Sequence, residues 1–182
     1  MVKFQSLGQE WPEWAKLPEE SSPTPVVKPP LGIYPARVDE RGRLKLPTDF
    51  QDFLKAVVEG SEQRFFITSL DLLTIRIYPL SVWQFNENLL QEETEDPQEA
   101  EDLAFIANDM GGASEIDSQG RVLLPAPLRE LLKLNGEPVP VYLQLYKGRI
   151  SVLTEELYQK QRARARENAA ERVARMEKRG LR

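Results

Sequence analysis

The sequence contains no cysteine and no histidine among its 182 residues. The chain therefore has no disulfides, no Cys/His zinc site, no thiol nucleophile and no histidine-dependent catalytic triad. It also lacks a Gly-rich phosphate-binding loop and any paired catalytic signature. We expect a protein that is not an enzyme, with no metal site, no cofactor and no small-molecule substrate.

Long apolar segments are also missing. No apolar run approaches the roughly 18 residues of a membrane span, and the N-terminus lacks a signal-peptide pattern. The hydrophobic content of 41% is enough to build a buried core. These features predict a soluble cytoplasmic protein with no membrane partner.

The net charge of −5 is unevenly distributed. Residues 160–182 carry nine Lys or Arg against three Glu, a local balance of +6, which leaves −11 for residues 1–159. The basic segment fits either a solvated helical tail or a nucleic-acid contact. The position of the charges along the chain is therefore more informative about binding partners than the net charge.

One nine-residue motif occurs twice, 78 residues apart. Residues 39–47 read DERGRLKLP and residues 117–125 read DSQGRVLLP, with Asp, Gly, Arg and Pro in the same places. Asp39 and Asp117 can accept bonds from backbone amides just ahead, and Gly42 and Gly120 tolerate the positive φ of a tight turn. Each copy predicts a turn that leads into a short strand.

The two predicted motif strands differ in pattern. Leu44 and Leu46 alternate with Arg43 and Lys45, which predicts one apolar face and one cationic face. Residues 122–124 read VLL, a continuous apolar run typical of a strand buried on both faces.

The segments after the motifs also repeat. TDFQDFLK follows Pro47 and APLRELLK follows Pro125, both with helical spacing of apolar residues. Further strands are expected at 33–38, 65–68, 72–78, 139–145 and 150–153. Two units of this size are small for independent folding, so we expect them to share one core.

Polar residues predict how the helices start and stop. Capping boxes are expected at Thr48 with Gln51 and at Ser81 with Gln84, and caps at Asp96 and Thr154. Chain breaks are expected at Gly111 and Gly112 and at Asn135 and Gly136.

Two further segments have distinctive compositions. Residues 1–30 hold six of the fourteen prolines and predict a disordered arm, in which Trp11 and Trp14 either dock on the protein or bind a partner. Residues 87–102 contain eight acids and no base. A carboxylate metal cluster is conceivable there, but a solvated helical face is the favoured interpretation.

The motif, YPLSVW at residues 78–83 and ASEIDSQGRVLLPAPLRE at 113–130 together resemble the MraZ family of bacterial regulators. The resemblance covers about residues 31–158. It implies an α+β fold, mainly β barrel, in which two tandem swapped-hairpin units of the AbrB/SpoVT type form an intrachain pseudodimer with connecting helices and a C-terminal helix. The implied parts are an arm (1–30), a first unit (31–80), an acidic helical connector (81–109), a second unit (110–158) and a basic tail (159–182).

The resemblance also implies a nucleoid-associated, ring-like homo-oligomer that binds direct repeats in double-stranded DNA upstream of the division and cell-wall gene cluster, its own promoter included. The DNA-facing residues would be Arg37, Arg41, Arg43, Lys45 and Arg121. Asp39, Gly42, Asp117 and Gly120 would support the turns.

Two alternatives stay open. Arg43 and Arg121 either read bases or only stabilise their turns by pairing with Asp39 and Asp117, and both roles are compatible. The whole chain could instead be a non-enzymatic interaction scaffold that has lost or weakened DNA binding, as the acidic sum over residues 1–159 favours.

Overall fold

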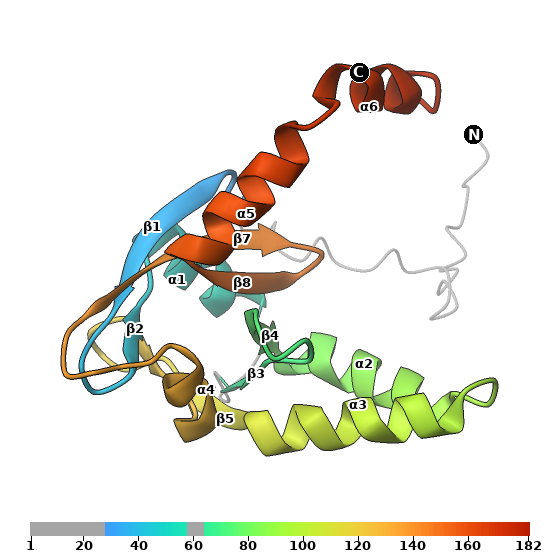
Figure 1. The fold of residues 1–182 in the computed structure, drawn as a ribbon. Helices are drawn as coiled ribbons and strands as arrows, with labels where there is room; N and C mark the ends of the chain where they lie inside the picture. Colours follow the sequence, from blue (N-terminus) through green and yellow to red (C-terminus); the bar gives the residue numbers. More distant parts are fainter. Residues whose placement is uncertain (1–27, 58–63) are drawn as a thin grey trace, which may run out of the picture.

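The computed structural model describes residues 28–57 and 64–182 (Figure 1). The predicted arm, with Trp11 and Trp14, lies almost entirely outside the described residues. The strands are β1 (Ile33–Val38), β2 (Arg43–Lys45), β3 (Arg64–Thr68), β4 (Ile75–Pro79), β5 (Gly112–Glu115), β6 (Arg121–Leu123), β7 (Val139–Tyr146) and β8 (Arg149–Thr154). The helices are α1 (Thr48–Val57), α2 (Leu80–Glu92), α3 (Pro97–Met110), α4 (Ala126–Leu131), α5 (Glu155–Arg166) and α6 (Ala169–Glu177).

The eight strands form one antiparallel sheet in the order β5-β3-β4-β8-β7-β1-β2-β6. A β-bridge between Ile116 and Val122 joins the ends of this series. The sheet is therefore a nearly closed barrel, and the predicted α+β fold with a mainly β barrel is confirmed. Figure 1 shows α2 and α3 side by side below the barrel, with α5 and α6 leading away on the other side.

The two repeats exchange strands within the chain. The first strand of each repeat pairs with the third strand of the other, β1 with β7 and β5 with β3. The second strands pair with each other, β2 with β6, and so do the fourth, β4 with β8. This exchange is the predicted swapped-hairpin pseudodimer, and it leaves no repeat with a complete sheet of its own.

The same local strand pairing occurs in both repeats. Val38 opposes Leu44 in the first repeat, and the residues 78 positions later, Ile116 and Val122, oppose each other in the second. Leu46 N donates to Gly120 O at 3.0 Å, and Leu124 N donates to Gly42 O at 2.9 Å. Each motif strand therefore ends in a hydrogen bond to the turn of the other copy.

One hydrophobic core fills the barrel and draws on both repeats at matched positions. Burying each of these side chains contributes roughly 1.5–3 kcal/mol, so neither repeat retains its core without the other. The matched buried residues are Leu44 and Val122, Leu46 and Leu124, Phe50 and Leu128, Leu54 and Leu132, and Ile75 and Ile150.

A smaller cluster joins α2 and α3 to the barrel. Trp83 stacks on Phe66 with ring centroids 4.3 Å apart and also packs against Tyr78 and Ala107. Thr68 Oγ1 donates to the carbonyl of Ala107 at 2.8 Å. Trp83 is only 7% exposed, because α3 folds back over it.

Some local expectations were wrong. Leu123 is 50% exposed, because β6 alternates between the core and the surface like β2 and is not buried on both faces. Helix α2 begins at Leu80 with Pro79 as its N-cap and no side-chain cap, so Ser81 caps nothing. Gln51 does not complete a capping box; its Nε2 donates to Leu46 O at 2.7 Å. The chain turns after α4 at Lys133, with φ of 53°, earlier than expected.

Other local expectations are confirmed. Asp96 accepts from the amide of Glu99 at the start of α3, and Thr154 accepts from that of Leu157 at the start of α5. Helix α3 ends at Met110, directly before Gly111. No helix within the described ranges is long and apolar enough to cross a bilayer. The division into units remains a prediction.

Each glycine turn lies under a helix of the other repeat. A Cβ on Gly120 would lie 2.3 Å from Cδ of Gln51 in α1, and one on Gly42 would lie 2.0 Å from Cδ of Arg129 in α4. Both glycines also have positive φ, 72° and 79°. Glycine is needed here for the backbone conformation, and a Cβ at either position would also displace the side chain that covers the turn.

We expect Gly120→Ala to destabilise the fold by about 1 kcal/mol or more beyond the cost of backbone strain, because Gln51 must move and lose its bond to Leu46. Gly136→Ala is the matched control, since Gly136 also has positive φ but has nothing within 4 Å of its would-be Cβ. Urea unfolding measures both variants. Equal losses of unfolding free energy in the two variants would mean that glycine is required at position 120 for its backbone conformation alone.

Candidate nucleic-acid interface

The outer surface of the β2–β6 pair gathers basic side chains from both repeats. Leu44 and its partner Val122 are fully buried beneath it. The neighbouring positions face outward, so Lys45 lies opposite Arg121, and Arg43 lies opposite Leu123. Three cations that are far apart in sequence thus share one two-stranded surface.

In the first turn, Asp39 organises the backbone and the guanidinium of Arg43. Its Oδ1 accepts the amides of Arg41 at 3.0 Å and Arg43 at 2.8 Å, while Oδ2 accepts Nε of Arg43 at 2.6 Å. The amide of Gly42 donates to the carbonyl of Asp39 and closes the turn. The predicted Asp–Arg pairing is present.

The second turn has the same geometry. Asp117 Oδ1 accepts the amides of Gln119 and Arg121, both at 2.9 Å, and Oδ2 accepts Nε of Arg121 at 2.8 Å. In both turns only Nε bonds to the aspartate. The two terminal nitrogens of each guanidinium have no hydrogen-bond partner within residues 28–57 and 64–182.

Both aspartates have lowered pKa values. Desolvation alone would raise the pKa of Asp39, but the backbone and side-chain bonds from Arg43, the amide of Arg41 and the positive charge of Arg43 together lower it. The pKa of Asp117 is lowered in the same way by Arg121 and the amide of Gln119. Each turn therefore binds the ionised carboxylate best.

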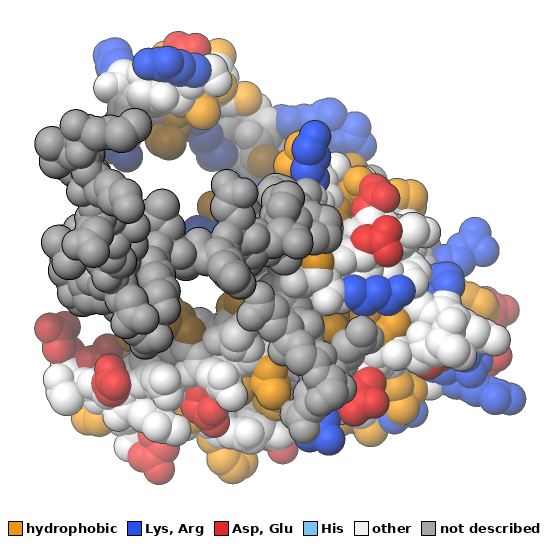
Figure 2. Space-filling model, turned by 180° about the vertical axis from the view of Figure 1, so that it is seen from behind, with side chains coloured by type: hydrophobic (Ala, Val, Ile, Leu, Met, Phe, Trp, Pro, Cys, Tyr) orange, Lys and Arg blue, Asp and Glu red, His pale blue; other side chains and the backbone are white. Residues whose placement is uncertain are grey.

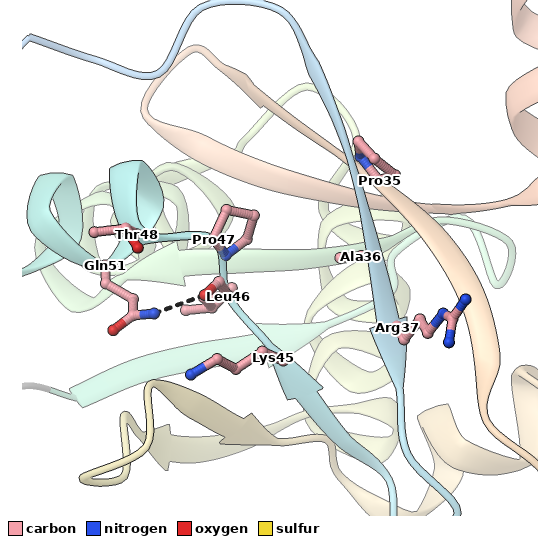
Figure 3. Close-up of a pocket in the computed structure, with 8 residues that line it drawn as sticks. All are labelled: Pro35, Ala36, Arg37, Lys45, Leu46, Pro47, Thr48 and Gln51. Carbon is pink, nitrogen blue, oxygen red and sulfur yellow. Dashed lines mark hydrogen bonds between the residues drawn. The ribbon is translucent and has the colours of Figure 1, made fainter.

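The other predicted contacts surround this surface. Lys45 Nζ donates to the carbonyl of Gln119 in the opposite turn, and the side chain of Arg41 is exposed at the tip of its own turn. Arg37 and Lys45 line a cavity of about 580 Å³ between β1, β2 and the start of α1 (Figure 3). Their charged ends point away from each other, so Arg37 lies at the edge of the surface.

Acidic side chains predominate on one side of the molecule. Figure 2 shows them along the α2–α3 side, at the lower left, whereas basic and acidic side chains are mixed at the opposite edge. Among the described residues, no three acidic side chains converge in a way that would hold a metal ion. The acidic run follows an exposed helical face.

Sequence reasoning missed Gln51 and Arg129 as supports of this surface. They lie 78 residues apart, at matching places in the two repeats, and each covers the turn of the other copy. Their matched positions were visible in the sequence. The exchange that brings them to the opposite turns was not.

The sequence is similar to several proteins named Transcriptional regulator MraZ. A protein named Transcriptional regulator MraZ from Acidobacterium capsulatum is 41% identical over 116 residues, which cover 63% of this chain and 77% of the relative. The chain belongs to the MraZ family. The family model described as MraZ protein matches residues 111–180.

Further MraZ relatives extend the match. The protein of the same name from Koribacter versatilis is 35% identical over 107 residues, covering 58% of this chain and 71% of the relative. The Desulfitobacterium hafniense protein is 32% identical over 146 residues, covering 78% of this chain and 94% of the relative. The predicted family resemblance is confirmed.

The lowered pKa of Asp39 predicts a pH dependence of stability. A folded-state pKa below the ordinary value of 3.8 means that the unfolded chain binds protons more readily. The stabilisation is fully present above that value and is lost as pH falls through the folded pKa. Asp39→Asn should therefore lower the melting temperature at pH 7. On acidification, the melting temperature of this variant should fall less than that of the parent protein.

Glu40→Gln is the control, because it removes an exposed neighbouring carboxyl from the same turn. Thermal unfolding at a series of pH values down to about 3 compares the three proteins. A parallel response of Asp39→Asn and Glu40→Gln would refute the special role of the Asp39–Arg43 pair.

Proposed function

We propose that this protein is a sequence-specific, DNA-binding transcriptional regulator that reads double-stranded DNA with the outer surface of β2 and β6. The observation that carries the proposal is the cross-repeat pairing of Lys45 with Arg121, which sets basic groups from both motifs side by side. A two-stranded β element fits the major groove of B-DNA. The names of the MraZ relatives support a role in transcription.

The aspartates prepare the arginines for this role. Asp39 and Asp117 each hold Nε of their arginine and leave its terminal nitrogens for a ligand. Arginine reads guanine by donating two bonds to O6 and N7. A guanidinium already fixed by its aspartate loses less conformational freedom on binding.

The two motifs contribute unequally in this proposal. At matching positions the first copy carries Arg37, Arg41, Arg43 and Lys45, whereas the second carries Glu115, Gln119, Arg121 and Leu123. Phosphate affinity follows local cations, with a salt slope of about −0.9 per neutralised phosphate. The first motif therefore provides most of the binding, and the second provides one arginine.

The protein acts as a ring-like homo-oligomer on direct repeats upstream of the division and cell-wall gene cluster, its own promoter included. It works in the cytoplasm at the nucleoid and performs no catalysis. Several copies are needed because one β2–β6 surface spans only a short stretch of duplex. Phe85 and Phe105 on the α2–α3 pair, 69% and 70% exposed, offer an apolar surface for a second copy.

An interaction scaffold without DNA binding is the alternative. The exposed acidic α2–α3 side favours it, because acidic surfaces repel duplex DNA (Figure 2). The two functions predict opposite results for the motif arginines.

We expect Arg43→Ala to weaken binding to promoter DNA by roughly 1–3 kcal/mol if its guanidinium reads a base, and Arg41→Ala mainly to flatten the salt slope by about one unit. Arg121→Ala should cost less affinity, since its motif carries fewer cations. Fluorescence titration at three salt concentrations, with melting temperatures, measures each effect.

Equal losses at Arg43 and Arg121 would show that both motifs read DNA alike. Unchanged affinity in both variants would reject the β2–β6 surface and favour the scaffold.

Replacing both Phe85 and Phe105 by Ser should shift the protein to smaller species in light scattering at micromolar concentration, because the shared apolar surface is lost. Val173→Ser, which removes an exposed apolar side chain from α6, should leave the assembly unchanged. A parent protein that is already monomeric would contradict self-assembly.

A further inference from the structure

A second cationic feature lies on the wall of the barrel opposite the motif strands. A cleft of about 450 Å³ separates α5 from the outer face of β4, β7 and β8. In the strand order, β4 and β8 are farthest from β2 and β6. Figure 1 shows α5 crossing β7 and β8 on its way to α6. Residues that face this cleft are therefore remote from the proposed DNA surface.

The cleft has a surplus of positive charge. Arg76, Arg149, Lys160 and Arg164 line it, and Asp71 is the acid among the lining residues. Asp71 is already engaged, because its Oδ2 accepts from Arg76 at 2.9 Å and its Oδ1 accepts amides of its own loop. The other three cations have no carboxylate partner among the residues that the structure describes.

Arg149 is the least satisfied of these groups. Its Nε is buried and lacks a hydrogen-bond partner within the described ranges. A buried donor on a charged group costs free energy unless an acceptor reaches it. The position of Arg149 in the cleft wall makes a bound anion a natural acceptor.

The barrel itself does not require these cations. Helix α2 is the counterpart of α5 in the first repeat, 75 residues earlier. It carries Phe85 and Leu89, which are 69% and 58% exposed, where α5 carries Lys160 and Arg164. These outward-facing helix positions are therefore apolar in the first repeat and basic in the second.

We propose that this cleft binds a small anion that carries phosphate groups, of about nucleotide size. Arginine and lysine side chains that converge in a concave site are suited to phosphate oxygens. Thr74 and Ser151 add hydroxyl donors to the lining. The volume lies in the range of small-molecule sites, about 300–1,000 Å³.

Duplex DNA is a poorer occupant because the cleft is a recess between a helix and the sheet, whereas the proposed DNA surface is an open pair of strands. The inference is independent of the DNA proposal, since the two surfaces lie on opposite walls.

The test is calorimetric titration of the full chain with sodium pyrophosphate and with ATP at low salt. Arg164→Gln and Arg149→Gln should each weaken binding by about tenfold, equivalent to 1.4 kcal/mol. Arg162→Gln is the matched control, because it removes the same charge from the same helix but does not line the cleft. Its affinity should stay within about twofold of the parent value.

The melting temperature of each variant shows whether it folds, and Arg164→Gln remains informative if Arg149→Gln does not, because Arg164 is exposed. Equal weakening in Arg162→Gln, or no heat of binding with either probe, would overturn the proposal.

Competition experiments distinguish other occupants. Displacement of pyrophosphate by a duplex of unrelated sequence would assign the cleft to DNA phosphates. Displacement by a peptide of residues 92–102 would assign it to the acidic helices of a second copy. Either result would overturn a small-molecule site, whereas competition by ATP alone would support it.

Discussion

The antiparallel pairing of β2 with β6 is the constraint on which the rest of the structure depends. Each of these strands is three residues long and too short to be stable by itself. Their pairing, with the Ile116–Val122 bridge, closes the barrel and allows one core to form from two incomplete repeats. Because Leu44 and Val122 must point inward at this junction, Lys45 and Arg121 must point outward.

The motif residues follow from the same junction. Gly42 and Gly120 make turns that are covered by side chains from helices of the opposite repeat. The carbonyl of each glycine also accepts a hydrogen bond from the end of the opposite motif's strand. Asp39 and Asp117 then join turn and arginine through one carboxylate each. The structural and the proposed DNA-reading roles of the arginines are compatible, since Nε serves the turn and the terminal nitrogens remain for a ligand.

The two repeats are alike in the barrel interior and differ on the surface. Inside the barrel, matched positions hold residues of the same apolar kind, because close packing restricts size and polarity. Outside, Lys45 is matched by Leu123, and Phe85 and Leu89 are matched by Lys160 and Arg164. Surface positions carry little of the folding free energy, so the repeats could diverge there into a basic strand pair, an apolar helical surface and a cationic cleft.

The sequence by itself determined the repeat, most strands, the aspartate turns and the caps at Asp96 and Thr154, because these depend on spacing within a few residues. Its local patterns failed where partners are distant. Leu123 was expected inside but faces solvent opposite Arg43. Only the tertiary structure placed Gln51 over Gly120 and left Arg149 unsatisfied in a cleft beneath α5. The family resemblance implied a strand exchange, but the register that aligns Lys45 with Arg121 came from the folded chain, because hydrogen bonding between strands 78 residues apart leaves no local pattern in either one.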